Sequence, residues 1–443
     1  MSNWQKVKIG DFLFERKGRY KPNDEQIVNL PRIEKIDFGG NFHIGNKDSK
    51  TDMILIKDGD LVISGINVAK GAMGIYSGED VTATIHYSSY TFDSNKINVE
   101  YFKRFLKSSE FIELLNEQVK GGIKTEIKPK HILPLEIQLP DINTQAQIVQ
   151  HFENVEDDIA DVTKEVLKQE SLLKKLKQTI LQEAIEGKLT AKWRAKNPDI
   201  GTAKELLEQI KTEKEKLVKD KKIKASKLLA PINEDEIPFD IPPSWEWCKF
   251  GEIIYENPRN GYSPKTVDYK TEIKTLKLGA ITQGYFDTTQ IKYLDISIEK
   301  DSFLWLKKGD VLIQRSNSLE HVGMAGIYNL KDTNYIYPDL IMKCQVVQPV
   351  INYFIHKYLV SNFTREYFRN NASGAQQSMP KINQGTVTNL LVPLPPTEEQ
   401  KEIVATIEKL FTICDELESE INQNKTTVDN LMATVLKEAF EQQ

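Results

Sequence analysis

The sequence predicts an α+β chain in which two mixed α/β globular domains are separated by two long helices. The helices are expected to pair as an antiparallel coiled coil, so that the chain forms a pseudo-two-fold internal repeat. Three observations predict this fold class: an apolar heptad seam occurs twice, short motifs of the globular parts recur in the same order, and glycine, proline and capping residues separate the segments.

The heptad seams predict the two long helices. The first seam alternates steps of four and three residues and is interrupted only at Gln169. Adding 255 to each of its positions gives a second apolar seam, and Gln169 then maps onto Asn424. An apolar repeat sustained over four heptads indicates a left-handed coiled coil, roughly 50 Å long for each seam. The first seam consists of Ile148, Phe152, Val155, Ile159, Val162, Val166, Leu173, Leu176 and Ile180.

Equal seams with the same polar interruption favour pairing of the two helices with each other, although two separate amphipathic helices remain an alternative. Gln169 and Asn424 are predicted to lie buried in the seam and to select its register, at a cost in stability. Each globular part precedes its own helix, so antiparallel pairing would place the two domains at opposite ends of the coil. Parallel pairing would require the linker to run back along the helices.

The repeat extends into the globular parts. Residues 57–63 match 307–313, and residues 71–76 match 323–328, while the offset drifts from 241 at Trp4 and Trp245 to 255 at the helices. In each copy a Gly-Asp pair before an apolar run predicts a turn that enters a buried strand. Helical spacing is expected over 101–119 and 352–370, and extended strands over 133–140 and 390–396.

Local signals set the predicted boundaries. Thr397 opens a capping box, and Gly187 is a typical helix end. A second capping box at Thr202 opens a charged helix that is expected to run to about Lys227, followed by a proline-rich linker. Its lysine-rich stretch, 211–227, fits a solvated helix face or a DNA-binding patch. The predicted segments are a first domain (1–142), a first long helix (143–190), a charged helix and linker (191–242), a second domain (243–396) and a second long helix (397–443).

Composition limits the class of protein. Residues 1–140 contain 20 basic and 19 acidic residues, and residues 243–396 contain 17 and 14, whereas the whole chain has a net charge of −5. The acidic excess therefore belongs to the helical connectors, which leaves the globular parts free to bind DNA through local patches. There is no apolar run long enough to cross a membrane, and the three scattered cysteines indicate a reducing, cytoplasmic location.

No catalytic motif emerges from the sequence. Gly187-Lys188 lacks the upstream glycine of a phosphate-binding loop, and the six histidines share no metal-ligand spacing. A serine hydrolase would need a nucleophile elbow and an acidic partner, and the Ser88-Ser89 region after His86 offers neither. We therefore expect a chain that is not an enzyme, with no catalytic residue, metal or cofactor of its own.

Three strings carry a family resemblance. In specificity subunits of type I restriction–modification systems, residues 394–404 resemble the region after a recognition domain, residues 180–189 the close of the central helix, and residues 243–247 the start of the second recognition domain. The resemblance covers the whole chain in the order domain, helix, domain, helix. The resemblance implies that domains 1–142 and 243–396 are target-recognition domains, each reading one half of a bipartite, asymmetric site in double-stranded DNA. The helices would act as spacers and dock two methyltransferase subunits, which restriction and translocase subunits would join. S-adenosylmethionine, ATP and Mg²⁺ would belong to those partners.

Candidate DNA-binding residues follow from the groups that direct readout needs, on loops that can reach base edges. In the first domain lysines dominate, so phosphate contact is the safer expectation there, and for any single residue an ordinary solvated loop side chain remains the alternative. The candidates are Ser64, Asn67, Lys70, Lys120, Lys124, Thr125 and Lys128 in the first domain, and Gln314, Arg315, Ser316, Asn317, Gln376, Gln377, Ser378 and Lys381 in the second.

Two other functions remain as alternatives. A duplicated coiled-coil scaffold would assemble proteins without reading DNA, and it would show no sequence preference for DNA even with a methyltransferase partner present. A nuclease with its own site would cleave DNA in a metal-dependent way as the isolated chain. The target bases, the gap between half-sites and the methylated adenines do not follow from the sequence.

Overall fold

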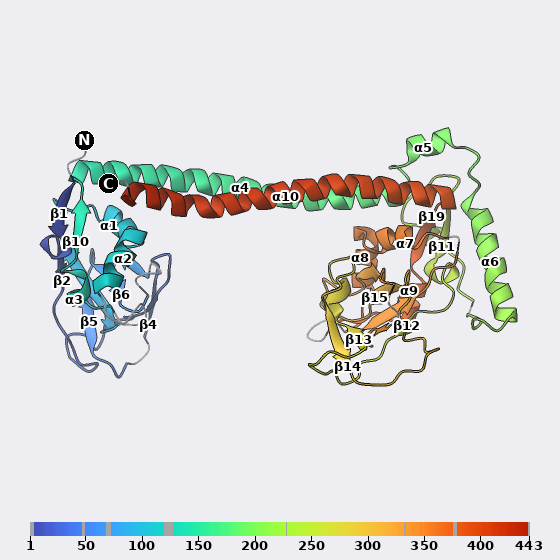
Figure 1. Ribbon diagram of the computed structural model, residues 1–443, viewed down its shortest axis with the longest axis horizontal. Helices are drawn as coiled ribbons and strands as arrows, with labels where there is room; N and C mark the ends of the chain where they lie inside the picture. Colours follow the sequence, from blue (N-terminus) through green and yellow to red (C-terminus); the bar gives the residue numbers. More distant parts are fainter. Residues whose placement is uncertain are drawn as a thin grey trace. The chain divides into compact units, whose positions relative to one another are not determined.

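The computed structural model describes residues 4–46, 49–67, 72–118, 127–226, 228–331, 334–348, 350–374 and 379–441 (Figure 1). The chain divides into two compact units. Unit 1 comprises Met1–Lys168 and Ile421–Gln443, and unit 2 comprises Gln169–Glu420. Both long helices therefore contribute one part to each unit, and each unit is described by itself.

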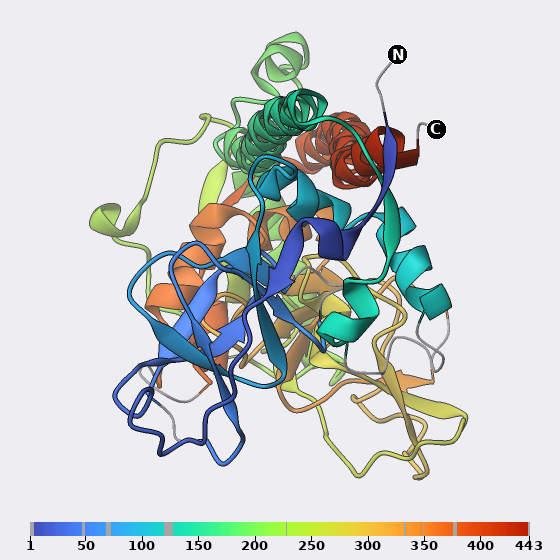
Figure 2. The ribbon, with the colours of Figure 1, turned by 90° about the vertical axis from the view of Figure 1, so that its left-hand side faces the viewer.

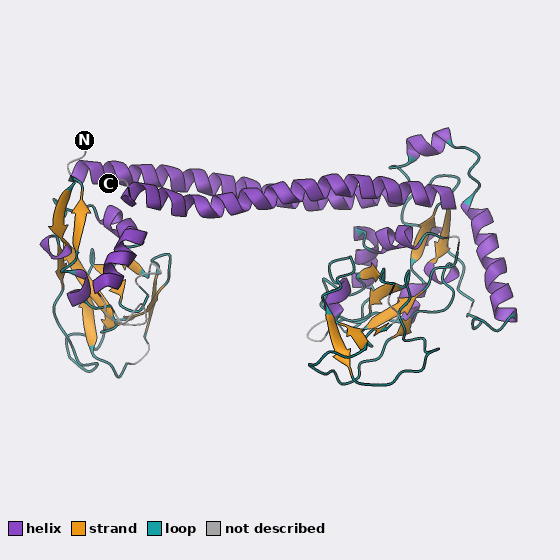
Figure 3. Ribbon diagram, in the orientation of Figure 1, coloured by secondary structure: helices purple, strands orange, loops and turns teal. Residues whose placement is uncertain are grey.

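In its described residues, unit 1 combines short strands with short helices, as Figures 2 and 3 show. Its elements are β1 (Gln5–Lys8), β2 (Leu13–Glu15), β3 (Arg32–Ile36), β4 (Phe42–Gly45), β5 (Met53–Ile56), β6 (Leu61–Ser64), β7 (Met73–Ile75), β8 (Val81–Thr84), β9 (Tyr87–Phe92), α1 (Val99–Phe105), α2 (Ser109–Gln118), α3 (Pro129–Ile132), β10 (Glu136–Leu139) and the start of α4 (Ile142–Ile185).

The strands of unit 1 form two four-stranded sheets, with orders β2-β9-β6-β7 and β4-β3-β8-β5, and a pair of β1 with β10. One apolar cluster of unit 1 packs the first sheet against α1 and α2, with Phe12, Tyr90 and Phe102 each at most 1% exposed. Phe152 of α4 and Val435 of the second long helix belong to the same cluster. Both long helices are therefore fixed to the globular part of unit 1 by apolar burial.

Unit 2 holds the remaining elements. These are α5 (Ala191–Lys196), α6 (Ala203–Lys219), β11 (Glu246–Lys249), β12 (Arg259–Asn260), β13 (Ile273–Leu276), β14 (Ile291–Leu294), β15 (Val311–Gln314), β16 (Ala325–Ile327), β17 (Tyr335–Ile336), β18 (Ile341–Cys344), α7 (Asn352–Leu359), α8 (Asn362–Asn370), α9 (Gln384–Thr388), β19 (Leu391–Leu394) and α10 (Thr397–Glu441). The charged helix α6 ends at Lys219, eight residues before the predicted Lys227, because Asp220 and Lys221 close it with a turn in which Lys221 has φ +57°.

Strand pairing repeats between the units. In unit 1, β6 lies between β7 and β9, and in unit 2, β15 lies between β16 and β18. Strand β3 pairs antiparallel with β4 and parallel with β8, and β13 pairs in the same way with β14 and β17. The mixed α/β fold with a repeated globular part and two long helices is thus confirmed.

The predicted helices 101–119 and 352–370 are each two helices. Ser108 and Ser361 cause the break, because each serine Oγ donates to a carbonyl three residues earlier, at 2.7 Å from Phe105 O and from Tyr358 O. Side-chain bonds of this kind compete with helix continuation, and the next helix starts directly afterwards. Helical periodicity alone did not reveal this interruption.

In unit 2 the two long helices run in opposite directions along each other. Lys177 of α4 pairs with Asp415 and Glu418 of α10, at 2.9 and 2.7 Å. Just after the end of α4, Thr190 donates to Glu399, near the start of α10, at 2.7 Å. Residues later in α4 thus contact residues earlier in α10, as expected for antiparallel helices. Figure 1 shows these two segments of unit 2 side by side. Pairing along the whole length as a coiled coil remains a prediction.

Most of the buried seam residues belong to one of the two rows of each seam, and Ile403, which is 0% exposed in the other row of α10, is an exception. Phe152, Val166, Leu173 and Ile180 of α4 are at most 8% exposed, whereas the alternate positions Val162 and Leu176 are 47% and 44% exposed. The second helix shows the same alternation: Ile407, Cys414, Ile421 and Val435 are buried, and Leu417 and Leu431 are each 41% exposed. Val162, Leu176, Leu417 and Leu431 thus form a marginal row on each helix, which the two helices alone do not cover.

The expected burial of Asn424 is wrong. Asn424 is exposed, and Gln169 is half-buried. Both residues belong to the marginal row, so the desolvation cost that makes a buried polar residue select a register is absent at Asn424. A register role for Gln169 remains a prediction.

Among the described residues, there is no helix with the length and apolar character needed to cross a membrane.

Candidate nucleic-acid interface

The candidate segment of unit 2 begins at the end of β15, where Gln314 is a structural residue. Its side chain is 0% exposed. The amide nitrogen donates to Leu278 O and Thr282 Oγ1, both at 2.8 Å, and the amide oxygen accepts from Asn317 Nδ2 at 2.9 Å. These bonds commit the amide within the unit, so the prediction that Gln314 contacts DNA bases is wrong for this conformation.

Arg315 has the properties expected of a DNA-contacting side chain. Its main chain is fixed on both sides, because its N–H donates to Leu340 O at 2.8 Å and its carbonyl accepts from Ile382 N at 2.9 Å. The half-buried side chain has no hydrogen bond or ion pair within the described part of the chain. A fixed backbone with an uncommitted guanidinium suits bidentate recognition of guanine or of phosphate.

The residues that follow Arg315 divide between structural and solvent-facing roles. Ser316 is 0% exposed, and its Oγ has no hydrogen-bond partner in the described structure. Asn317 is half-buried and held by Gln314. Ser316 therefore lies too deep to read DNA directly, and Asn317 is accessible only in part.

Lys381 joins Arg315 at this place. An isolated bridge pairs Lys381 with Ser316, and Ser373 exchanges two main-chain hydrogen bonds of 2.9 Å with Lys381. The Lys381 side chain is exposed. The structure thus brings the two cations of the predicted set together on neighbouring backbone segments. Gln376, Gln377 and Ser378 lie outside the described residues.

The corresponding segment of unit 1 has the same pattern of main-chain hydrogen bonds but different side chains. Gly65 stands where unit 2 has Arg315: its N–H donates to His86 O at 2.9 Å, and its carbonyl accepts from Ile127 N at 2.7 Å. Ser64 is only 5% exposed, Asn67 is half-buried and Lys128 is exposed at the start of α3. Ser64 is thus too deep for direct contact with DNA. Lys70, Lys120, Lys124 and Thr125 lie outside the described residues.

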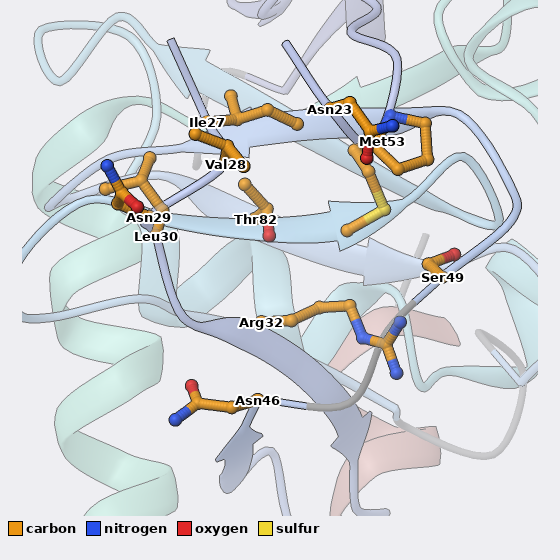
Figure 4. A pocket seen from close by; sticks show the side chains of 11 residues that line it. Asn23, Ile27, Val28, Asn29, Leu30, Arg32, Asn46, Ser49, Met53 and Thr82 are labelled. Carbon is orange, nitrogen blue, oxygen red and sulfur yellow. The ribbon is translucent and has the colours of Figure 1, made fainter. Parts of the chain in front are cut away.

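Unit 1 also contains a polar pocket that sequence reasoning missed. Its volume is about 360 Å³. Figure 4 shows Arg32, at the start of β3, extending across it on the side of Ser49, with Asn29 and Asn46 also on its wall. Ile27 and Met53 supply apolar lining. The Arg32 guanidinium has no bonded partner among the residues described. The only sequence signal was an arginine between Pro31 and an alternating strand.

A buried aspartate precedes each candidate segment in the sequence and accepts hydrogen bonds from side chains and from the main chain. In unit 1, Asp60 is 1% exposed and accepts two bonds from Arg16, at 2.6 and 2.7 Å, and one from Ser89 Oγ at 2.7 Å. The hydrogen bond to Asp60 raises the pKa of Arg16. In unit 2, Asp310 is 0% exposed and accepts from Gln345 Nε2 at 2.6 Å. Both aspartates also accept from the main chain three residues earlier. These are the two Gly-Asp turns predicted before β6 and β15.

A buried glutamine joins the start of each long helix to the globular part of its unit by hydrogen bonds. Gln145 accepts from Asn98 N at 2.7 Å and donates to Pro140 O at 2.8 Å. Gln400 accepts from Ile351 N and donates to Pro395 O, both at 2.8 Å. Both side chains are 0% exposed. The repeat seen in the sequence therefore persists at the level of single hydrogen bonds.

Unit 2 has a further anchor at Glu399, which is 0% exposed. Its Oε1 accepts from Thr190 Oγ1 at 2.7 Å and from Arg194 Nη1 at 2.9 Å, and its Oε2 accepts from Trp245 Nε1 at 2.8 Å. Arg194 also donates to Gly187 O, where α4 has ended and the backbone has φ +71°. One carboxylate thus joins the end of α4, the first strand region and the start of α10. We name Thr190, Arg194, Trp245 and Glu399 the Glu399 node.

Within the described residues, no three His, Cys, Asp or Glu side chains gather in a way that could hold a metal ion. Cys248, Cys344 and Cys414 are all free and buried. Burial raises the pKa of the Cys248 and Cys414 thiols, which makes them poor nucleophiles. The arrangement is therefore suited to binding: cations on fixed loops, supported by buried hydrogen-bond networks.

Comparison with known proteins agrees with this picture. Residues 242–424 match the family described as "Type I restriction modification DNA specificity domain". The chain is 31% identical to the EcoEI specificity subunit of Escherichia coli over 269 residues, which is 58% of this chain but only 43% of that subunit. It is 26% identical to the EcoAI specificity subunit of Escherichia coli over 469 residues, covering 91% of this chain and 77% of that subunit.

Two solved structures share the fold along the chain. One, described as the structural basis of complex assembly and conformational transition of the type I R-M system, has a TM-score of 0.67 at 15% identity and covers 99% of this chain and 97% of that one. The HsdS subunit from Thermoanaerobacter tengcongensis has a TM-score of 0.56 at 16% identity, with the same coverage. At these identities the likeness concerns the fold alone.

Proposed function

We propose that the chain is the non-catalytic subunit that selects the DNA sequence on which a type I restriction–modification complex acts, because residues 242–424 match the DNA specificity domain of that family and its specificity subunits are similar along the chain. Each globular part would read one half of a bipartite, asymmetric site in double-stranded DNA. The observation that carries the proposal is the pair of equivalent loops after β6 and β15, which share main-chain wiring and differ in side chains.

The difference between the loops supports two unlike half-sites. Unit 2 offers Arg315 and Lys381, whereas unit 1 has Gly65 at the matching backbone position and offers Lys128 nearby. Arginine can read guanine through two hydrogen bonds, and lysine contacts phosphate as a point charge. The Arg32 pocket gives unit 1 its own arginine on a different sheet. We therefore infer that the two readers use different chemistry on the same scaffold.

The long helices would set the spacing between the half-sites. Opposed directions of α4 and α10 in unit 2, together with the shared burial of Phe152 and Val435 in unit 1, support an antiparallel pair. A coil of roughly 50 Å would suit half-sites about one helical turn apart, or somewhat more.

The marginal rows of the helices support docking of two methyltransferase subunits. Unit 1 exposes Val162 and Leu431, and unit 2 exposes Leu417 and Leu176. The offset of 255 relates each member of one pair to one member of the other. Each unit thus presents an equivalent apolar strip, one for each copy of the methyltransferase. Restriction and translocase subunits would join this core in the cytoplasm. S-adenosylmethionine, ATP and Mg²⁺ would then be bound by the partners.

The test is a selection from a random-sequence duplex library by the full chain in complex with its methyltransferase. The proposal expects enrichment of two short defined blocks separated by a gap of fixed length, with an adenine methylated within the blocks. A library that stays unenriched, with the complex intact, would overturn the proposal and favour the scaffold alternative. Metal-dependent cleavage by the isolated chain would favour the nuclease alternative.

A further inference from the structure

The loop between β15 and β16 rests on helix α8. Gly323, with φ +75°, packs so closely on the Phe368 ring that a Cβ atom would collide with it. Gly323 N also donates to Gln314 O at 2.7 Å. At the other end of the loop, Arg315 is tied to Leu340 and Ile382. The loop 315–323 is therefore held at Arg315 by Leu340 and Ile382 and at Gly323 by helix α8.

Arg365 of α8 is the unusual residue under this loop. It is 3% exposed, and its Nη2 donates to Glu320 O at 2.8 Å. Its Nε and Nη1 have no hydrogen-bond partner within the described residues. Burial lowers the pKa of Arg365 to about 10, and nearby Arg369 adds to the effect, so the guanidinium is still charged at neutral pH. Ser316 Oγ and His321 Nδ1, in the same loop, are also buried without a partner.

Stability does not account for this arginine. A buried charge without a counter-ion is costly, and an apolar side chain of similar volume would be the favourable choice. Unit 1 has an apolar residue at the matching position: Ile112, which is half-buried, lies four residues after Ser108, as Arg365 lies four residues after Ser361, and both serines donate to a carbonyl three residues earlier. The arginine is thus a feature of the second reader, whose loop differs from that of the first.

We propose that Arg365 is a positioning residue for sequence reading by unit 2: it holds the carbonyl of Glu320 and thereby presents Arg315 to the DNA. This inference depends on the proposed function. Arg365 itself is too deeply buried to touch a base. Its role is to keep the loop in the one conformation in which the Arg315 guanidinium faces outward from a fixed backbone. An apolar residue at this position would leave the unit folded and the loop free to adopt other conformations.

The test uses Arg365→Met in the full chain, bound to its methyltransferase, on duplexes with single base changes in each half-site. Arg369→Met is the matched control, because it removes the same charge from an exposed position on the same helix. In the half-site whose discrimination depends on Arg315, Arg365→Met is expected to reduce discrimination about tenfold, comparable to the loss of one base contact. The other half-site and the affinity for unrelated DNA should change less than about threefold, and Arg369→Met should leave discrimination unchanged.

Unchanged discrimination by Arg365→Met would overturn the inference, as would an equal loss at both half-sites that Arg369→Met reproduces. If Arg365→Met does not fold, Arg365→Lys is the variant that tests the inference, since lysine keeps the positive charge but lacks the planar, branched guanidinium. It should lose part of the discrimination at the same half-site, and wild-type behaviour would contradict the inference. A wild-type complex without any sequence preference would instead refute the proposed function, so the two failures are distinguishable.

Discussion

Replacing Glu399 with glutamine should loosen unit 2 where the long helices meet the second globular part. The change is nearly isosteric, but it removes the charge that faces Arg194 and one of the two oxygens that accept hydrogen bonds. If the amide oxygen keeps Thr190 and Arg194, the amide nitrogen faces the N–H of Trp245, and two donors then oppose each other. The reverse orientation leaves Arg194 opposite a donor.

The magnitude follows from the burial of the node. Glu399 is 0% exposed, whereas Arg194 is 19% exposed and keeps its bonds to Gly187 O. A hydrogen bond to a charged group contributes about 1.5–3 kcal/mol, and a buried donor left without a partner costs about 1–3 kcal/mol. Breaking a buried pair by removing one partner costs about 3–5 kcal/mol. Because Arg194 is partly solvated, we expect the lower end, about 3 kcal/mol in the opening free energy of this region.

Hydrogen exchange measured by mass spectrometry tests this locally, because a chain with two units does not unfold as a single two-state system. Peptides around 187–199 and 397–405 should lose protection in Glu399→Gln, while unit 1 peptides serve as the internal reference. Glu398→Gln is the control variant, since its exposed pair with Lys401 contributes little. Equal protection in the two variants, within about 1 kcal/mol, would refute the reasoning; so would Glu399→Gln having its full effect in an Arg194→Met background.

Three further outcomes are expected. Burial lowers the pKa of His356 to about 4 from 6.5, so below pH 6.5 the unfolded chain binds the extra proton and the stability of unit 2 falls by roughly 3 kcal/mol as pH drops toward 4. His356→Gln should flatten that pH dependence in the hydrogen exchange of unit 2 peptides, and an unchanged slope would contradict it. Asp at both Leu176 and Leu417 should reduce bound methyltransferase from two copies to one in native mass spectrometry, because the marginal apolar strip of unit 2 is lost; two copies retained would exclude that strip. Asn424→Leu should change the free energy of unfolding, measured by thermal melting, by less than about 0.5 kcal/mol, since Asn424 is exposed. Gln169→Leu should increase the free energy of unfolding by up to about 1 kcal/mol. Equal effects of the two variants would indicate that both residues are buried.

Local and periodic features of the fold were predictable from the sequence. The capping residues at Thr397 and the stop at Gly187 act through neighbouring backbone, so they marked the ends of the long helices well. The Gly-Asp turns were predictable because the internal repeat preserves residues whose side chains bond the backbone. When a residue and its hydrogen bond both recur in the second copy, the repeat in the sequence itself indicates the contact.

Features that depend on distant contacts were not predictable. The Glu399 node joins Glu399 to residues that lie 154 to 209 positions away in the sequence. The exposure of Asn424 depends on how the two helices face each other, which a heptad pattern does not specify. Gln314 looked like a reader because it is polar at the end of a strand, yet the structure uses its amide internally. The role of Arg365 could not be predicted, because it depends on the contact of helix α8 with loop 315–323, which forms only in the folded chain.

The central claim is that two readers with separate chemistry lie on one chain, and Arg315→Ala tests it most directly. The measurement is the equilibrium preference of the methyltransferase complex for each base at every position of both half-sites, at one fixed salt concentration. The account predicts that Arg315→Ala relaxes preference in one half-site only, by about 1–3 kcal/mol at the base it contacts, while every position of the other half-site stays as in the wild type. Loss of preference in both half-sites, or in neither, would contradict the account.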